Sequence, residues 1–303
     1  MRRQSARTGF TVMELAITCA ILATAFTLVL PAVQRARVQS RSSQCKNNFK
    51  IIGLALHNYY DTYNTFPPGW IRKTPYAQSP SAFGWQVSIL PFVEQGQLFD
   101  ELYGHMSYPF EAGAFDRPDR KLLEQPLAVF RCPADTTGEP NTMRGRWGTS
   151  NYSGNFGSDP IPRLLPLTGS MYWPGAESTP TSTPGLFSWN SSTRFRDIVD
   201  GSSNTFLVGE RALSSSAGIW PGVRSNSAET DAVTDTSPGN EINSGPNAFS
   251  SQHKGGSHFV FCDGAVFFIN EKIASRGTGA REAEGIYQNL GNRQDGHPAR
   301  FLE

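Results

Sequence analysis

The first strong pattern along the chain is an almost continuous apolar run near its amino end. The run covers residues 10–33, which is 24 residues, and Glu14 is its one charged residue. As an α-helix it would measure roughly 36 Å, enough to cross a hydrocarbon core of about 30 Å. The run therefore predicts a membrane-spanning helix, in which a carboxylate requires a partner.

A second apolar pattern follows without a break. Residues 34–63 contain no proline, and large apolar residues recur every three or four positions, at Phe49, Ile52, Leu56, Tyr59 and Tyr63. This spacing predicts one stripe of a helix. We therefore expect the outer half of the same helix over residues 34–66, packed on a sheet and ending before Pro67-Pro68-Gly69.

Residues 67–303 predict a β-rich domain of short strands and long loops. Thr205 to Glu210 predicts a strand, and residues 258–269 predict a hairpin around Asp263-Gly264. A two-residue Asp-Gly loop favours a type I′ turn, which would pair Cys262 with Ala265. Both faces of the hairpin are apolar, so we expect it to be central and covered on each side.

Composition supports an α+β fold and narrows the function classes. The chain has 21 prolines and 29 glycines, and residues 214–251 are polar and glycine-rich, which predicts a long loop that is either functional or disordered. A net charge of +1 with 17% charged residues offers no basic patch for nucleic acid. The fold class that we expect is a long amino-terminal helix on an antiparallel sheet with long loops.

The residues before the apolar run predict its orientation. Residues 1–9 carry Arg2, Arg3 and Arg7 and no acid, which keeps the amino end in the cytoplasm. A secretory signal peptide is disfavoured, because the run exceeds the usual apolar core and no A-x-A cleavage site follows it. A plain signal-anchor helix leaves Glu14 unexplained. We expect a single-pass inner-membrane protein with a periplasmic or cell-surface domain.

The junction after this basic leader has a recognisable form. Gly9-Phe10-Thr11-Val12-Met13-Glu14 followed by an apolar helix resembles the class III signal of type IV prepilins and type II secretion pseudopilins. The resemblance implies that prepilin peptidase cuts between Gly9 and Phe10 and methylates the new amine of Phe10. It also implies that Glu14, then the fifth residue, pairs with a neighbouring subunit's amine and so offsets its own burial.

Further motifs resemble a large bacterial family of prepilin-like proteins of unknown function. Its carboxyl-terminal signature, His-x9-Asp-Gly, matches His253, Asp263 and Gly264. Other segments match in the same order, namely Cys45-Lys46-Asn47-Asn48, Pro67-Pro68-Gly69, Cys132-Pro133-Ala134-Asp135 and Gly209-Glu210. Because the role of that family is poorly defined, the resemblance implies topology and export more than activity.

The signature residues also raise the question of chemistry. His253, His258 and Asp263 could form a metal trio, but His258 and Asp263 would lie about 15 Å apart on an extended strand. We therefore expect no metal there: Asp263 would shape the turn and His253 would hold the preceding loop. A calcium site is an alternative for the acidic residues of the polar stretch, which are Glu229, Asp231, Asp235 and Glu241, although no EF-hand pattern is present.

The four cysteines divide by compartment. Cys19 lies in the apolar run, whereas Cys45, Cys132 and Cys262 would face an oxidising compartment. Three pairs can form among these three. Cys262 fits the core of the hairpin, which favours a Cys45–Cys132 bond worth roughly 4–5 kcal/mol on the chain-entropy model.

These patterns predict a structural role. We expect a prepilin-like subunit of a cell-envelope filament or protein-export machine, whose partners are prepilin peptidase, other pilin or pseudopilin subunits and the membrane. The alternative is a solitary anchored periplasmic or surface protein that binds a ligand through residues 214–251 and does not polymerise. A hydrolase is disfavoured because no G-x-S-x-G elbow or other compact catalytic set occurs.

Overall fold

The computed structural model of the chain describes residues 9, 11–71, 81–104, 115, 119–136, 138, 141–161, 183–224, 229–275 and 285–297. The chain divides into two compact units, Met1–Ser43 and Gln44–Glu303. The boundary lies inside the first helix, whereas the sequence pattern placed its boundaries at residues 33 and 66.

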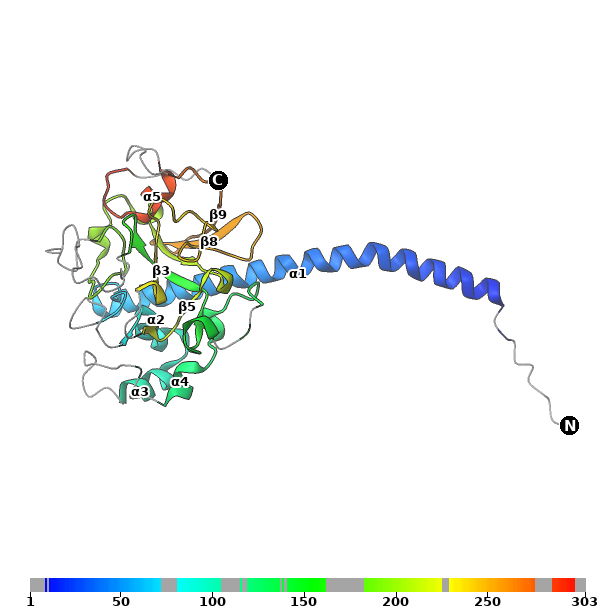
Figure 1. Cartoon of the computed structure of the whole chain (residues 1–303), viewed down its shortest axis with the longest axis horizontal. Helices are drawn as coiled ribbons and strands as arrows, with labels where there is room; N and C mark the ends of the chain where they lie inside the picture. Colours follow the sequence, from blue (N-terminus) through cyan, green and yellow to red (C-terminus); the bar gives the residue numbers. More distant parts are fainter. Residues whose placement is uncertain are drawn as a thin grey trace, which may run out of the picture. The chain divides into compact units, whose positions relative to one another are not determined.

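The described part of the chain contains five α-helices and nine strands, together with short 3-10 helices. Figure 1 labels several of these elements. The helices are α1 (Val12–Tyr63), α2 (Trp85–Ser88), α3 (Gly96–Gly104), α4 (Arg120–Glu124) and α5 (Ile286–Gly291). The strands are β1 (Ala82–Phe83), β2 (Thr149–Ser150), β3 (Tyr152–Gly157), β4 (Phe206–Glu210), β5 (Gly218–Ile219), β6 (Gly222–Val223), β7 (Val233–Asp235), β8 (Gly256–Phe261) and β9 (Val266–Asn270).

Helix α1 is continuous through Pro31 and ends at Tyr63, three residues before the limit expected from the sequence. Asn64 adopts a left-handed conformation (φ 58°), and its N–H donates to the carbonyl of Tyr60 at 2.6 Å. A left-handed residue just after the last helical turn is a common way to end a helix, and asparagine tolerates it. Asn64, rather than the Pro67-Pro68 pair, therefore sets the end of α1.

The carboxyl-terminal part of α1 packs on the sheet as the apolar stripe predicts. Phe49, Ile52 and Leu56 are fully buried. The ring of Phe49 meets that of Tyr152 on β3 edge-to-face, with centroids 4.7 Å apart. The prediction is wrong for Tyr63, which is 57% exposed, because the helix ends there.

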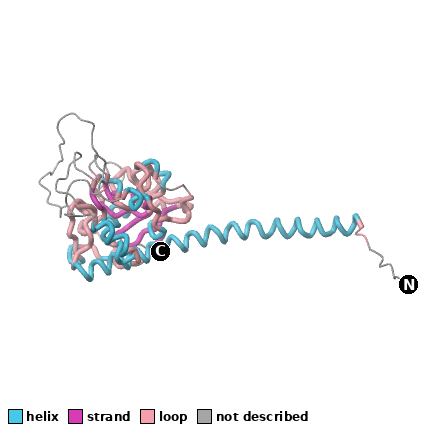
Figure 2. Tube along the Cα trace, turned by 90° about the horizontal axis from the view of Figure 1, so that it is seen from below, coloured by secondary structure: helices cyan, strands magenta, loops and turns pink. Residues whose placement is uncertain are grey.

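A five-stranded sheet forms the centre of the domain, in the order β7-β3-β4-β8-β9. Figure 2 shows its strands surrounded by short helices and loops. All neighbouring strands are antiparallel except β3 and β7, which are parallel. The predicted α+β class with an antiparallel sheet is confirmed, apart from this one parallel pair.

The polar stretch at residues 214–251 is not one long loop. It contributes the short strands β5 and β6, and β7 forms one edge of the central sheet. Trp220 and Val233 within it are fully buried. The prediction of one long loop is therefore wrong for the described residues, because their polar side chains are largely buried and hydrogen-bonded within the fold.

The carboxyl-terminal hairpin exists, but its turn differs from the expected one. Phe259 pairs with Phe267 and Val260 with Val266, one position away from the predicted register. The N–H of Gly264 donates to Phe261 O at 2.9 Å, so residues 262–264 form a three-residue loop. In this loop Gly264 has positive φ (84°) and Asp263 does not, which fits a type I turn with a bulge rather than type I′.

The two strands of this hairpin also differ in burial. Every residue of β8 is buried, whereas β9 is the edge of the sheet and is partly exposed. The expectation that the hairpin is covered on both sides is therefore correct for β8 and wrong for β9.

Candidate functional site

The start of α1 carries the residues of the expected peptidase signal. Gly9 is exposed, and Phe10 lies outside the described residues. The backbone N–H and the hydroxyl of Thr11 each donate to Glu14 Oε2 at 2.9 Å, and the N–H of Glu14 lies 3.3 Å from Thr11 Oγ1. This reciprocal arrangement is a capping box. The Thr-x-x-Glu spacing at Thr11 and Glu14 is the sequence signal for it.

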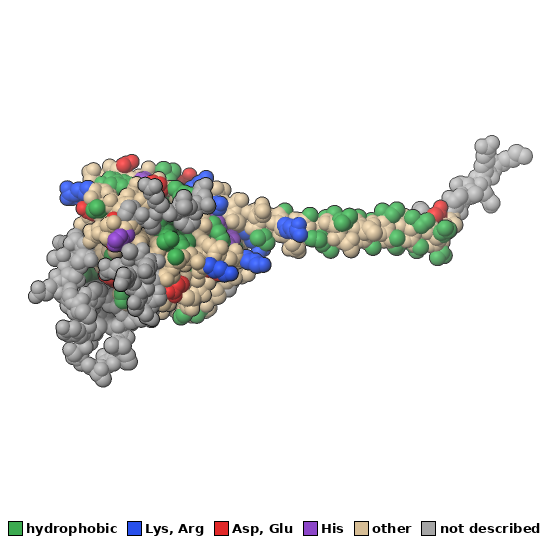
Figure 3. Space-filling view, turned by 90° about the horizontal axis from the view of Figure 1, so that it is seen from above, with side chains coloured by type: hydrophobic (Ala, Val, Ile, Leu, Met, Phe, Trp, Pro, Cys, Tyr) green, Lys and Arg blue, Asp and Glu red, His purple; other side chains and the backbone are tan. Residues whose placement is uncertain are grey.

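The amino-terminal part of α1 has apolar side chains that are exposed. Figure 3 shows apolar side chains along it, and the members that are more than half exposed include Leu15, Ile17, Ile21, Leu22, Phe26 and Leu28. Within the described part of the chain, α1 is the one helix long and apolar enough to cross a membrane. This is consistent with a single-pass anchor.

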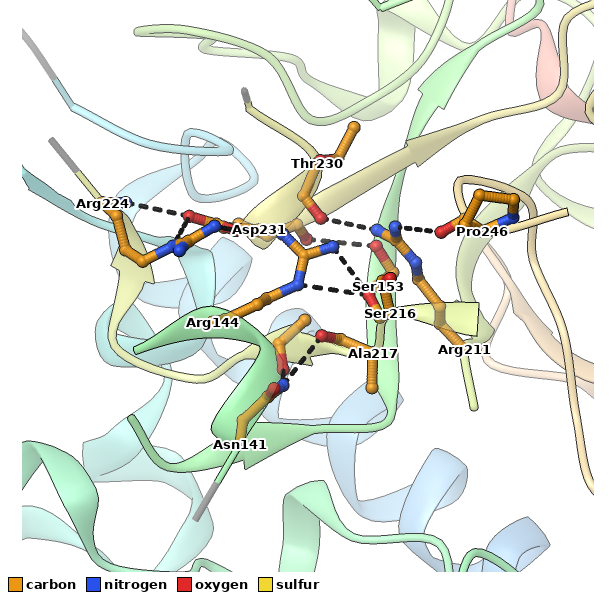
Figure 4. Close-up of polar contacts among 12 residues, drawn as sticks. Asn141, Arg144, Ser153, Arg211, Ser216, Ala217, Arg224, Thr230, Asp231 and Pro246 are labelled. Carbon is orange, nitrogen blue, oxygen red and sulfur yellow. Dashed lines mark hydrogen bonds and ion pairs between the residues drawn. The ribbon is translucent and has the colours of Figure 1, made fainter. Parts of the chain in front are cut away.

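The acidic residues considered for calcium have other partners. Asp231 is fully buried and forms ion pairs with Arg144 and, at 2.9 Å, with Arg224 (Figure 4). Asp235 accepts a hydrogen bond from Asn240 Nδ2 at 2.6 Å. Of Glu229 only the backbone is described. These contacts neutralise Asp231 with guanidinium groups, so it is poorly suited to hold a cation.

The ion pairs of Asp231 belong to a larger buried polar network. Arg211 is fully buried, and its guanidinium donates to the carbonyls of Thr230 at 2.5 Å and Pro246 at 2.8 Å (Figure 4). Burial lowers the pKa of Arg211 well below its usual value, and the nearby charge of Arg144 lowers it further. This network fastens residues 214–251 to the domain, which is a structural role.

A second polar cluster lies where α1 meets the domain. A disulfide joins Cys45 on α1 to Cys132, with the two Cα atoms 5.3 Å apart, and this is the pair favoured from the sequence. Cys262 is a buried free cysteine and Cys19 an exposed one. The bond therefore covalently links the helix to the segment that precedes β2.

Glu210, the last residue of β4, faces this disulfide. Its Oε1 lies 3.4 Å from Nε2 of His253 and 3.6 Å from Sγ of Cys132. Its Oε2 accepts from the backbone N–H of His258 at 2.8 Å and lies 3.2 Å from the Nδ1 of that ring. Burial would raise the pKa of Glu210, but the hydrogen bonds from His253 and His258 outweigh it and lower the pKa to about 2.

The two histidines of the trio considered from sequence do meet, but without Asp263. The rings of His253 and His258 are perpendicular, with centroids 4.8 Å apart, and both contact Glu210. Asp263 instead stabilises the turn, where its carboxylate accepts from the N–H of Ala265 at 2.9 Å. Gly264 supplies the positive φ of that turn.

We call Cys45, Cys132, Glu210 and His253 the Cys–Glu–His cluster. One potential ligand atom from each of the four lies within 4.8 Å of all the others, and the four side chains are buried or nearly so. Sequence reasoning paired the cysteines but did not connect them with Glu210 or His253. These residues come from α1, two loops and β4, so their meeting leaves no local spacing in the sequence.

Comparison with known proteins supports the expected family. A family model described as "Protein of unknown function (DUF1559)" matches residues 34–276, well over half of the chain. The chain belongs to this family. The DUF1559 match begins just after the apolar run, so it covers the Cys–Glu–His cluster but not the amino-terminal signal. Neither the curated proteins nor the solved structures gave a match. Family membership and the apolar helix together indicate a membrane-anchored, pilin-like protein.

Proposed function

We propose that this DUF1559 protein is a prepilin-like structural subunit that prepilin peptidase cleaves between Gly9 and Phe10. The mature chain assembles through α1 into a cell-envelope filament or protein-export machine. The observation that carries the proposal is the amino-terminal part of α1, whose exposed apolar side chains require lipid or another helix as their surroundings. The basic leader and the carboxylate at the start of this helix match the signal of a cleaved subunit.

Glu14 has two separable roles in this proposal. Within one chain it caps α1, and both Thr11 donors bind the same oxygen, Oε2. The second oxygen then accepts from the methylated amine of a neighbouring subunit, which neutralises the carboxylate in the membrane. The cap needs only a hydrogen-bond acceptor, whereas the pair between subunits needs the charge.

The remaining parts of the proposal concern topology and partners. The leader stays in the cytoplasm and the apolar run at residues 10–33 crosses the inner membrane. The outer half of the helix and residues 67–303 lie in the periplasm or at the cell surface. Prepilin peptidase and other pilin or pseudopilin subunits are the partners. A near-neutral charge supports the absence of nucleic acid among them, and we assign no catalytic activity to the chain.

Amino-terminal processing is tested by mass spectrometry of the protein purified from native membranes. We expect the mature chain to begin at Phe10 with a methylated amine. A Gly9→Asp variant should keep Met1 and remain unprocessed, because a side chain at this position blocks the peptidase in the proposed signal. A native protein that retains Met1, or one cut beyond Val33, would contradict the proposal.

Assembly is tested through the native Cys19, which is exposed on α1. Because each chain offers one exposed thiol, crosslinking in membranes should give covalent dimers of wild type and none of a Cys19→Ser control. Single cysteines at Ala20 and Ile21 in that control background, about 100° and about 200° around the helix from Cys19, report on its other faces. Monomers at every position, with normal membrane insertion, would instead support a solitary anchored ligand-binding protein.

Two matched variants then separate the roles of Glu14. Glu14→Gln keeps an acceptor for the Thr11 cap and loses the charge, whereas Glu14→Ala loses both. We expect normal cleavage and insertion of both variants and a loss of crosslinked dimers in both. Dimers at the wild-type level in Glu14→Gln would show that the charge has no role between subunits. Loss in Glu14→Ala alone would assign Glu14 to helix capping.

A further inference from the structure

We propose that the Cys–Glu–His cluster is a zinc site when Cys45 and Cys132 are thiols. In this state their two thiolates, Nε2 of His253 and Oε1 of Glu210 bind one Zn²⁺. The proposal rests on the arrangement of these groups and does not depend on whether the protein assembles into a filament.

The observed spacing fits tetrahedral zinc coordination. With zinc bonds of about 2.3 Å to sulfur and about 2.0–2.1 Å to nitrogen or oxygen, a tetrahedron places sulfur roughly 3.5 Å from either, and nitrogen and oxygen roughly 3.3 Å apart. Sγ of Cys132 lies 3.6 Å from both Oε1 of Glu210 and Nε2 of His253. The nitrogen and oxygen are 3.4 Å apart. Three ligand atoms are thus already placed, and opening the disulfide frees the sulfurs.

Neighbouring groups orient these ligands. Oε2 of Glu210 is occupied by the backbone N–H of His258 at 2.8 Å and by the hydroxyl of Ser257 at 3.4 Å, which directs Oε1 toward the sulfurs. The backbone N–H of Cys132 donates to Asn151 Oδ1 at 3.1 Å and fixes the cysteine loop. Such outer contacts are typical of protein metal sites, where they set the direction of each ligand.

The donor set selects the metal. Two thiolates and an imidazole favour zinc over calcium or magnesium, which prefer oxygen ligands. Cys45 and Glu210 are at most 1% exposed and His253 is 9% exposed. Four protein ligands in a buried position describe a closed, structural zinc site rather than a catalytic one, which would keep a position open for water.

The two states interconvert by thiol–disulfide exchange with a dithiol. The dithiol gives two electrons and two protons, its own sulfurs form a disulfide, and the Cys45–Cys132 bond becomes two thiols. Binding of Zn²⁺ then releases both thiol protons to solvent. Oxidation by a disulfide reverses the exchange and expels the metal. The oxidised chain links α1 to the domain through a covalent bond, and the reduced chain does so through zinc.

Zinc titration of the full-length chain in detergent tests the proposal. Cys19→Ala and Cys262→Ala form the background, so that Cys45 and Cys132 are the only thiols. One sample is reduced with a phosphine and another is left oxidised, and Zn²⁺ competes with a chromophoric chelator. We expect one Zn²⁺ per reduced chain with a dissociation constant on the order of nanomolar or below. The oxidised chain should bind at least about 100-fold more weakly. Co²⁺ in place of Zn²⁺ should give thiolate charge-transfer bands.

Variants in the reduced background rank the contributions of the ligands. Glu210→Gln and His253→Gln should each weaken zinc binding by more than about 100-fold, and His258→Gln, an outer contact, by about 10–100-fold. Glu241→Gln removes an acid outside the cluster and should leave binding unchanged. Circular dichroism checks the fold of every sample. Equal binding by oxidised and reduced chains, or by Glu210→Gln and Glu241→Gln, overturns the proposal. A reduced chain that stays unfolded with Zn²⁺ present overturns it as well.

Discussion

Two buried carboxylates of this domain, Asp231 and Glu210, meet very different partners. Arg144 and Arg224 surround Asp231, and they lower its pKa although burial alone would raise it. Glu210 instead meets two imidazoles and a sulfur atom. A guanidinium keeps its charge at every accessible pH, whereas an imidazole can release its proton or bind a metal.

The difference shows that burial alone does not separate a structural polar cluster from a reactive one. Both carboxylates are almost completely inaccessible to solvent. The partners of Glu210 can change their bonding, because a disulfide can be reduced to two thiols and an imidazole can bind a metal. The Asp231 cluster is consequently a fixed support, and the Cys–Glu–His cluster is the one that can respond to its surroundings.

Among changes to the two clusters, removal of the disulfide should lower the free energy of unfolding most. The bond closes a loop with a sequence separation of 87 residues. Replacing Cys45 and Cys132 with serine should lower the free energy of unfolding by roughly 4–5 kcal/mol, because the unfolded chain gains entropy. Urea unfolding with a metal chelator present measures this loss. Cys262→Ala, which removes a buried sulfur without breaking a bond, should lose only about 1 kcal/mol. An equal loss in both proteins would contradict the prediction.

Asp231→Asn should lower the free energy of unfolding nearly as much as removal of the disulfide. It leaves Arg144 and Arg224 buried without their counter-charge, a loss of about 3–5 kcal/mol in the free energy of unfolding. The matched control is Glu124→Gln, which breaks the exposed pair with Arg120 on α4 and should cost no more than about 0.5 kcal/mol. Similar urea midpoints for both variants would mean that burial adds nothing to the Asp231 pair.

The same cluster predicts how acid affects stability. The pKa of Asp231 in the folded protein lies below its ordinary value of 3.8, so its charge stabilises the fold above that pH. The stabilisation is lost as the pH falls through the lower folded pKa. Urea midpoints measured from about pH 5 down to about pH 2 should fall less steeply in Asp231→Asn than in wild type. Parallel curves would show that Asp231 titrates normally.

Glu210→Gln should lower the free energy of unfolding less than removal of the disulfide or Asp231→Asn does. The amide leaves a hydrogen bond unmade, which costs about 1–3 kcal/mol, whereas Asp231→Asn leaves two guanidinium groups buried without their counter-charge. Urea unfolding of this variant beside Asp231→Asn compares the two clusters directly. A loss as large as that of Asp231→Asn would contradict the contrast between the two clusters.

The sequence predicted the elements with strong periodicity. Apolar spacing predicts the helix and the strand that ends at Glu210. The compartment of the cysteines, with Cys262 in the core of the hairpin, favours the Cys45–Cys132 pair. The type of turn at Asp263-Gly264 is harder to predict from the sequence, because type I′ and bulged type I turns both place glycine at positive φ. The conformation of Asp263 alone separates them, and it shifts the register of the whole hairpin by one residue.

The Cys–Glu–His cluster could not be predicted, because only the tertiary fold brings its members together. The antiparallel pairing of β4 with β8 sets Gly209 opposite Phe259, and this places the adjacent Glu210 beside His258. The prediction of one long loop over residues 214–251 was wrong for another reason. Its composition indicated exposure, yet residues such as Thr234 are fully buried and satisfied by hydrogen bonds.

The position of Cys45 has a mechanical consequence. It is the first buried residue of α1, so a pull applied to the amino-terminal part of the helix enters the domain at this point. The bond to Cys132 carries that force directly into the segment before β2. Residues 46–131 then lie inside a closed covalent loop and bear no tension. Helix α1 cannot be peeled from the sheet under load unless a covalent bond breaks first.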